Sequence, residues 1–576
     1  MSADFLPVSQ ADLQKRGWTR LDIILVTGDA YVDHPSYGAA LIGRFLESKG
    51  FKVGIIAQPD WKNNEDFKKL GVPRLFFGVT SGNVDSMVAN YTANKRPRRT
   101  DEYSPGNKTG LRPDRALIVY TNKLREIFGK VPIVLGGMEA SLRRLAHYDY
   151  WDNEVRRSIL VDAKADILVY GMGEKQALEI AQRLDKGEDI NSLNDIRGAA
   201  VIRKDLNFLK DYATLPSFEE VKEDKEKFNE AFKITYSQQD PFKAKPVVQK
   251  HADRFVVQFP PSLPLKTQEM DEIYGLSFMR NWHPVYKKFA GIKGFETVKF
   301  SIISNRGCCG ECSFCSLYFH QGRIVQSRSP ESIYKEAKML SEREDFKGTI
   351  TDIGGPTANL YMAFCPMWEK DGFCKGKMCL APEKCKNLKL GYKESLKLYE
   401  KIRQLPKVKH LFIGSGFRYD LLTEDSASEY LEELCKHYIS GQMKVAPEHS
   451  VDKVLKIMNK PPFKVYEKFV DKFKQVNRKL DKELYLVNYF ITAHPGCSLE
   501  DAEKLAEYLK KHRIRPEQIQ DFLPLPMTLS GCIYYTGAHP LTNEKVYVPG
   551  TFRERKLQRA LVQRKGKRYN GGYERL

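Results

Sequence analysis

The sequence predicts an α/β protein with an N-terminal doubly wound parallel sheet and a C-terminal partial barrel of six strand-helix units. Strand-like and helix-like segments alternate twice along the chain, over residues 20–185 and again from residue 295 onward. At 576 residues the chain is also too long for one hydrophobic core. We therefore expect about two to four domains.

The N-terminal alternation begins with a strand at 21–30 (LDIILVTGDA), a helix at 37–50 and a second strand at 51–57. The strand-like segments VPIVLGG and ADILVYGMGE continue it to about residue 185. Glycines at strand ends allow a ligand to approach the backbone, although turn formation explains any single glycine better. These strand-end glycines are Gly28, Gly136, Gly137, Gly171 and Gly173.

Between residues 186 and 294 the pattern is poor and highly charged, so we expect a connecting region with a few helices. From residue 295, six strand-like segments alternate with helix-like segments such as PESIYKEAKMLSER. Such alternation builds a parallel barrel, and six units rather than eight leave it open on one side. The six strand-like segments are 297–304, 348–355, 409–416, 442–449, 484–494 and 518–527. The predicted domains are therefore 1–185, 186–294, 295–545 and a basic tail at 546–576.

The chain is strongly basic, with a net charge of +20 and a pI of about 9.2. This charge would suit a nucleic-acid partner through contacts to phosphates. Most lysines, however, are spread along predicted helices, and only residues 95–99 (KRPRR) and 551–568 concentrate the charge. We therefore favour a solvated surface over nucleic-acid binding.

The mean hydropathy is −0.48 and no apolar run reaches the roughly 18 residues that span a bilayer. The first residues also lack the apolar segment of a secretion signal. These features predict a cytoplasmic protein without a membrane partner. In that reducing compartment the eleven cysteines should be thiols, metal ligands or catalysts rather than disulfides.

Four cysteines lie in the segment NRGCCGECSFCSLYFHQGR, directly after the first predicted barrel strand, where parallel barrels bind ligands. The spacing allows two sets of three ligands, because either Cys308 or Cys309 can combine with Cys312 and Cys315. The set with Cys309 begins like a bacterial ferredoxin motif but lacks its fourth cysteine. A zinc site would need a fourth ligand, which Cys309 or His320 could supply.

The set Cys308, Cys312 and Cys315 needs no fourth protein ligand if it holds a 4Fe-4S cluster in which one iron stays open. Its C-x3-C-x2-C spacing, with Phe314 before the last cysteine, resembles the radical S-adenosylmethionine (SAM) superfamily. The resemblance implies that these three cysteines bind the cluster, that SAM binds the open iron, and that Phe314 packs near the adenine.

Further residues at predicted strand ends match the superfamily. The resemblance implies that Gly354 and Gly355, in DIGGPTAN, meet the SAM amino group. It also implies that polar side chains after the third and fourth strands bind the SAM carboxylate and ribose, and here these are Ser415, Arg418 and Glu448. Each alone is typical of an ordinary loop, but their common position favours a site.

Segments such as DIGGPTANLYM, GSGFRYDLL and DFLPLPMTLSGCIYYTG are similar, over essentially the whole chain, to the YgiQ-type family of radical SAM proteins with unassigned activity. This resemblance implies an N-terminal domain like the cobalamin-binding domains of other radical SAM enzymes. The better-known cobalamin motif is Asp-x-His, whereas here His34 follows Asp33 directly. The shift argues against axial ligation by His34 and favours a cobalamin-like fold without cobalamin.

The implied activity is reductive cleavage of SAM to a 5'-deoxyadenosyl radical that acts on an unknown substrate, with an electron donor such as flavodoxin or ferredoxin. The alternative is an iron-sulfur or zinc protein that binds nucleic acid without radical chemistry. Among the enzymatic alternatives, cobalamin-dependent methyl transfer stays open.

A second set of four cysteines lies in a Gly/Pro/Lys-rich loop after the second barrel strand. Four cysteines within 21 residues favour an auxiliary cluster or a structural zinc, although their irregular spacing matches no standard zinc finger. These residues are Cys365, Cys374, Cys379 and Cys385. The isolated residues Cys435, Cys497 and Cys532 are predicted to be core thiols.

Overall fold

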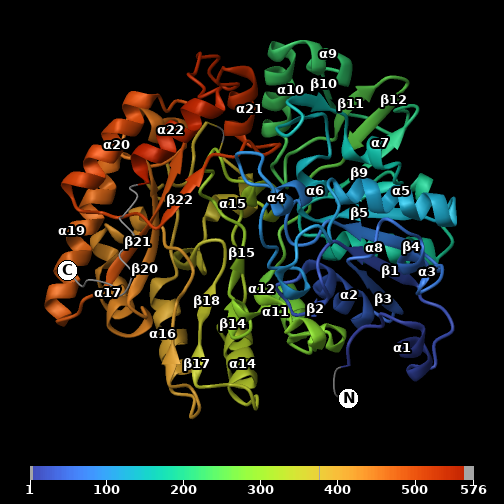
Figure 1. Cartoon of the computed structure of the whole chain (residues 1–576), viewed down its shortest axis with the longest axis horizontal. Helices are drawn as coiled ribbons and strands as arrows, with labels where there is room; N and C mark the ends of the chain where they lie inside the picture. The colour runs from blue at the N-terminus through green and yellow to red at the C-terminus, as the bar shows by residue number, and fades with distance from the viewer. Residues whose placement is uncertain (1–3, 375, 564–576) are drawn as a thin grey trace.

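The computed structural model describes residues 4–374 and 376–563, which form an N-terminal sheet and a C-terminal barrel that lie side by side (Figure 1). The N-terminal sheet has nine strands in the order β10-β11-β12-β9-β8-β5-β4-β1-β3. Their bounds are β1 (Ile23–Thr27), β3 (Val53–Ala57), β4 (Phe76–Thr80), β5 (Ile133–Gly136), β8 (Ile167–Val169), β9 (Ala199–Arg203), β10 (Ala213–Leu215), β11 (Val247–His251) and β12 (Arg254–Gln258).

Five neighbouring strands, β3, β1, β4, β5 and β8, pair in parallel. The β1 sequence IILVT is buried at every position, as expected for a strand with both faces covered. The helices α2 (Gly38–Ser48) and α8 (Glu174–Asp185) pack on one face of the sheet, and α5 (Ala116–Phe128) and α7 (Ile159–Ala163) pack on the other. The structure thus confirms the predicted doubly wound sheet.

Residues 186–294 differ from the predicted connecting region, because they add four strands to the same sheet. β9 and β12 pair antiparallel, β11 and β12 form an antiparallel hairpin, and β10 completes the edge. These strands are short, and polar residues interrupt their apolar run, as Gln249, Lys250 and His251 do in β11, where only Lys250 is exposed. This mixed composition hid the strands in the sequence, and no sheet edge coincides with the expected boundary at residue 185.

The C-terminal part is a partial barrel whose strands follow the chain order. β14 pairs with β18, β17 with β19, and β20, β21 and β22 pair consecutively, all in parallel. A parallel β-bridge from Phe417, after β19, to Val445 of β20 links the third barrel strand to the fourth. Among the described strands none joins β22 to β14, so the barrel is open there. The bounds are β14 (Ser301–Ile303), β17 (Thr349–Ile350), β18 (Asp352–Gly354), β19 (His410–Leu411), β20 (Gln442–Glu448), β21 (Tyr485–Thr492) and β22 (Gln518–Asp521).

Helices cover the outside of the barrel and close its core. In α19 (Phe463–Leu480), for example, the buried aromatic residues Phe463, Tyr466, Phe469 and Phe473 recur at helical spacing. The other covering helices are α14 (Pro330–Ser341), α16 (Tyr392–Arg403), α17 (Ser428–Glu433) and α20 (Leu499–Lys511).

Part of the predicted basic tail is folded. α22 (Phe552–Val562) packs on α20, β21 and β22 and buries Arg555, Gln558 and Val562, which share one helix face. Residues 564–576 lie outside the described residues. No helix in the described part of the chain combines the length and the hydrophobicity that a membrane span requires.

Candidate functional site

The cluster loop, which we define as residues 307–323, begins where β15 (Asn305–Arg306) ends. Gly307 has φ +80°, and a Cβ there would lie 2.2 Å from the carbonyl oxygen of Ile324, so this turn requires glycine. The Cys308 backbone N–H donates to Gly322 O at 3.1 Å, which closes the base of the loop. The short helix α13 (Leu317–Gln321) follows. The sequence therefore folds three spaced cysteines into one closed loop at the carboxyl end of the first barrel strand.

The thiols of this loop lie in a buried environment beside a cation. Burial raises the pKa of Cys308 and raises that of Cys315 to about 12. Arg418 Nη1 donates to Cys312 Sγ at 3.6 Å, and the same guanidinium pairs with Asp420 at 2.8 Å. The positive charge favours the thiolate form that metal binding requires.

A 4Fe-4S cluster fits the chemistry of this loop, because thiolates are its usual protein ligands. Among the described residues, no three His, Cys, Asp or Glu side chains are placed to hold a single metal ion. The thiolates of a cluster bind different irons and therefore stand farther apart than the ligands of one ion. The loop offers three thiols of the kind that such a cluster uses.

The two glycines expected near SAM lie where the second and third barrel strands approach each other. A Cβ on Gly354 would lie 2.2 Å from Ser415 Oγ, and one on Gly355 would lie 2.6 Å from Asn305 O. Ser415 donates its hydroxyl to Asp352, a residue that sequence reasoning missed. The Asp352 carboxylate also accepts the N–H groups of the third-strand turn, so Ser415 is held in place by its neighbour.

Arg418 and Glu448 approach the cluster loop from the third and fourth strand ends. Arg418, one of the residues expected to bind the SAM carboxylate or ribose, contacts Cys312. Glu448 is buried, and burial raises the pKa of its carboxyl group. It has φ +69° and follows a register shift between β20 and β21, and such an irregularity re-aims a side chain.

Phe314 contacts a buried polar chain that sequence reasoning did not single out. Its ring lies edge-on to His494 with centroids 6.0 Å apart. His494 Nε2 lies 2.7 Å from Ser530 Oγ, which donates to Ser313 Oγ at 2.7 Å. Ser313 precedes Phe314, so this chain holds the Phe314 segment against the end of β21.

Three comparisons place this geometry among known proteins. Residues 5–301 match the family model "Radical SAM N-terminal", residues 302–509 match "Radical SAM superfamily", and residues 517–569 match "Domain of unknown function (DUF3362)". A UPF0313 protein of Clostridium botulinum (strain ATCC 19397 / Type A) is 56% identical over 560 residues, covering 97% of this chain and 87% of that protein. A UPF0313 protein of Methanocella arvoryzae is 52% identical, with 97% and 92% covered.

The chain belongs to the radical SAM superfamily and, within it, to the YgiQ-type UPF0313 proteins. This confirms the family resemblance and identifies the chain as an enzyme. Among solved structures, the radical SAM methyltransferase TsrM from Kitasatospora setae, with cobalamin and a 4Fe-4S cluster bound, is 14% identical. Its TM-score is 0.47, and 88% of this chain and 77% of that chain are covered. The radical enzyme OxsB with aqua-cobalamin bound is 12% identical, with a TM-score of 0.45 and 85% and 52% covered.

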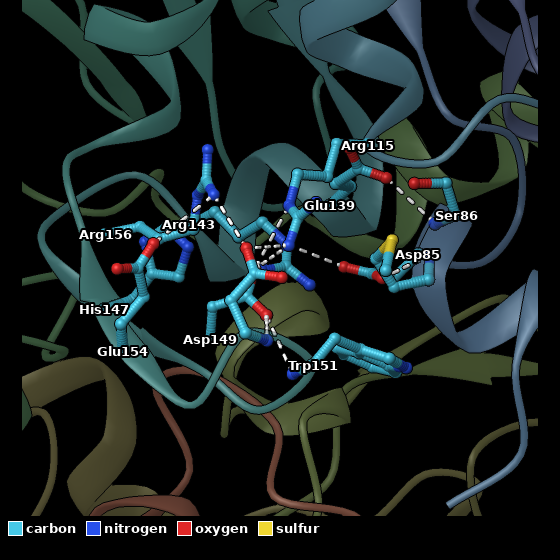
Figure 2. Close-up of polar contacts among 12 residues, drawn as sticks. Asp85, Ser86, Arg115, Glu139, Arg143, His147, Asp149, Trp151, Glu154 and Arg156 are labelled. Atoms are coloured by element: carbon cyan, nitrogen blue, oxygen red, sulfur yellow. Dashed lines mark hydrogen bonds and ion pairs between the residues drawn. The ribbon is translucent and has the colours of Figure 1, made fainter. Parts of the chain in front are cut away.

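In this UPF0313 protein the carboxyl edge of the N-terminal sheet is occupied by a buried charge network (Figure 2). Arg143 donates to Asp85 at 2.9 Å and lies 3.6 Å from Asp149, which also pairs with Arg115 at 3.1 Å. Glu139, from the helix after β5, accepts the Ser86 N–H at 2.9 Å, and burial raises its pKa. These side chains pair with one another at the edge where doubly wound sheets usually bind ligands, although the two terminal nitrogens of Arg143 have no hydrogen-bond partner among the described residues.

Except for Gly136, which has no atom within 4 Å of a Cβ built on it, the predicted strand-end glycines of this domain pack against protein atoms. A Cβ on Gly28 would lie 2.2 Å from Ser81 O, and one on Gly137 would lie 2.4 Å from Thr80 Oγ1. Gly171 meets the carbonyl of His320, whose ring Nδ1 lies 2.9 Å from Ser141 Oγ. The cluster loop therefore docks directly on the glycine-bearing edge.

A buried ion pair also joins the two parts at the cluster loop. Arg306, two residues before Cys308, lies 2.6 Å from Glu174 of α8, and both side chains are 2% exposed. Arg306 Nε also donates to Tyr274 at 2.8 Å. The position of the cluster loop therefore depends on the N-terminal sheet.

The second set of cysteines gathers next to the cluster loop. Cys365, Cys379 and Cys385 share one hydrophobic cluster with Cys309. The contact with Cys379, together with burial, raises the pKa of the Cys309 thiol well above its usual range. Cys309 thus turns toward this second set, and the thiol groups there are not arranged around a single-ion position within the described residues.

Proposed function

We propose that this UPF0313 protein binds a 4Fe-4S cluster through Cys308, Cys312 and Cys315 and reductively cleaves SAM to act on a substrate that remains to be identified. The observation that carries the proposal is the closed cluster loop with three thiols and a buried guanidinium at the carboxyl end of the first barrel strand. When bound and reduced, such a cluster coordinates SAM at its open iron and supplies the electron that breaks the sulfonium C–S bond.

The surrounding residues bind and orient SAM and exclude water. We assign the turn at Gly354 and Gly355 to the SAM amino group because it matches the Gly-rich turn of the superfamily, and the turn is too narrow for a side chain. The buried Glu448 faces SAM hydroxyl or amino groups as an acceptor, and Phe314 provides an apolar wall. Ser415 orients Asp352, to which its hydroxyl donates a hydrogen bond. Arg418 stabilises the negative charge of the cluster thiolates.

The electron comes from a small reductant such as flavodoxin or ferredoxin, and we place the protein in the cytoplasm. Cobalamin is not part of the proposal. His34 is buried, its Nδ1 accepts the Ser36 N–H, and Arg280 Nη1 lies 3.4 Å from Nε2. Tyr318, Phe319 and His320 fill the space between sheet and barrel and leave a cavity of about 80 Å³ there. Ligands of even drug size need roughly 300 Å³.

Anaerobic reconstitution tests the proposal. The protein, reduced with dithionite or with flavodoxin and its reductase, should convert SAM to 5'-deoxyadenosine and methionine. The Cys308→Ser, Cys312→Ser and Cys315→Ser variants should bind less iron and form no 5'-deoxyadenosine, whereas Cys309→Ser should retain both. A fully loaded wild-type protein that does not cleave SAM would contradict the proposal.

A further inference from the structure

The basic segment at residues 95–99 belongs to a hairpin that spans the two parts of the molecule. Tyr91 and Pro97 form an antiparallel bridge, and the Thr92 N–H donates to Arg96 O at 2.9 Å. The Arg98 N–H donates to Asn90 O at 2.8 Å, which ties the hairpin base to α4 (Ser86–Asn90). Residues 91–98, the basic hairpin, therefore have a fixed backbone.

The tip of the basic hairpin lies on the carboxyl end of the barrel. Asn94 Nδ2 donates to Asp521, the last residue of β22, at 2.7 Å, and Thr492 at the end of β21 donates to the same carboxylate at 2.9 Å. Lys95 Nζ donates to Trp151 O at 3.0 Å and lies 5.8 Å from the ring centroid of Phe552, the first residue of α22. The two basic segments seen in the sequence thus meet beside the mouth of the barrel.

The arginines of this region can contact a ligand, although Arg98 already donates its Nε to Val88 O at 2.9 Å and to Tyr91 O at 3.1 Å. Arg96, Arg98 and Arg99 are exposed, and within the described residues none of them has a carboxylate at ion-pair distance. By contrast, Arg115 of the network in Figure 2 is paired with Asp149 and Asp152. The hairpin is thus a strip of unneutralised positive charge.

Exposed basic residues also lie on α22. Arg553 and Lys556 of α22 are also exposed and unpaired among the residues that the structure describes. The strip is therefore longer than a single phosphate group and suits an extended polyanion.

A cavity of about 500 Å³ opens at the base of the basic hairpin. Trp61, Tyr91 and Arg98 line it, together with Arg112 and Asp114. Asp114 accepts hydrogen bonds from Asn90 and from the Tyr91 hydroxyl, so neutral donors satisfy it. Arg112 is 2% exposed, and its Nε has no hydrogen-bond partner in the described part of the chain. The cavity combines aromatic faces with a buried arginine in its wall.

We infer that the basic hairpin and this cavity bind single-stranded nucleic acid, with phosphates on Arg96, Arg98 and Arg99 and a base against Trp61 or Tyr91. Aromatic stacking combined with a cationic track is the general means of holding single strands without sequence preference. The tip of the hairpin delivers the strand to the carboxyl end of the barrel. That the strand is the substrate rests on the proposed function, whereas binding of the strand requires no cluster.

Fluorescence anisotropy of the reconstituted full-length protein with labelled oligouridine of about 12 nucleotides tests the inference. Arg96 and Arg99 make no described side-chain contacts, so the Arg96→Gln/Arg99→Gln variant should remain folded. It should lower the magnitude of the salt-dependence slope by about 1.4, or about 0.7 per lost phosphate contact. The control Lys464→Gln/Lys468→Gln removes the same charge from exposed positions of α19 and should leave the slope unchanged.

The aromatic part of the site is tested separately. Trp61→Leu should weaken binding about five- to 150-fold, the range expected for one lost stacking contact, with an unchanged salt slope. Trp61→Phe, which keeps an aromatic face, should bind nearly as wild type, and thermal melting confirms that both variants are folded. Equal weakening by the α19 control, or no binding by wild type, would overturn the inference.

Two further measurements separate the alternatives. If a free mononucleotide displaces the oligonucleotide at equal concentration, the site does not recognise a strand and the assignment is overturned. Binding of oligouridine or of its DNA counterpart supports the assignment. SAM cleavage without oligonucleotide is measured in parallel. If the protein cleaves SAM but does not bind the oligonucleotide, only the nucleic-acid site is overturned. If it binds the oligonucleotide but does not cleave SAM, the assignment of the strand as substrate and the proposed function are overturned.

Discussion

Replacing Arg418 with glutamine should make the bound cluster harder to reduce. Burial alone would lower the pKa of this guanidinium, but attraction by Asp420 and the cluster-loop thiolates raises it well above the usual value. Arg418 is therefore charged, 3.6 Å from Cys312 Sγ. A fixed positive charge stabilises the reduced cluster, which carries one more negative charge.

The distance gives the size of the effect. Two unit charges 3.6 Å apart interact by about 4.6 kcal/mol at an effective dielectric constant of about 20. For one electron this corresponds to roughly 200 mV, since a tenfold change in equilibrium constant is about 59 mV. Asp420 cancels part of the field, and the added electron is spread over the cluster. We therefore expect the reduction potential of Arg418→Gln to fall by about 50–100 mV.

Potentiometric titration followed by electron paramagnetic resonance measures this change. Arg418→Lys keeps the positive charge and should shift the potential less. Asp420→Asn removes the opposing charge and should raise the potential. A potential in Arg418→Gln that equals the wild-type value, with the cluster fully loaded, would refute the placement of this guanidinium beside the cluster.

Three further predictions concern stability. Glu174→Gln leaves the buried Arg306 without its charged partner and should lower the free energy of unfolding by about 3–5 kcal/mol in urea titrations. Replacing both residues by methionine should lower it much less. Equal losses in the two variants would contradict a role for the ion pair. Gly354→Ala would place a Cβ 2.2 Å from a side-chain oxygen and should lower the melting temperature, whereas Gly38→Ala, with no atom within 4 Å, should not. Burial lowers the pKa of His320 from 6.5 to about 4, so the unfolded chain binds the extra proton as the pH falls through this window. Between pH 6.5 and about 4, the free energy of unfolding of the wild type should fall by up to about 3 kcal/mol, and that of His320→Gln should fall less. If the free energies of the two proteins change with pH in parallel, His320 does not have the lowered pKa.

The alternation of buried strands and amphipathic helices was sufficient to predict the doubly wound sheet and the open six-unit barrel. Strands such as IILVT are buried on both faces and carry an uninterrupted hydrophobic signal. β11 is buried at all positions except Lys250 but also carries the polar Gln249 and His251, so residues 186–294 were expected to connect two domains, whereas they extend the sheet. α22 was hidden for a similar reason, because its buried face includes Arg555 and Gln558.

Cys308, Cys312 and Cys315 could be proposed from the sequence as cluster ligands, because their spacing lies within one loop. Contacts between distant segments could not be found in this way. Ser415 donates a hydrogen bond to Asp352 of the neighbouring strand, and Arg418 contacts Cys312. The meeting of the two basic segments also depends on the docking of the sheet against the barrel, which no local pattern records.

The most direct test of the central claim is electron paramagnetic resonance of the reduced protein with and without SAM. If Cys308, Cys312 and Cys315 hold a cluster with an open iron, SAM should change the spectrum of the reduced cluster, and SAM labelled with ¹⁷O in its carboxylate should show coupling to it. Cys309→Ser should behave as wild type. A reduced cluster whose spectrum does not change although SAM binds would contradict the claim.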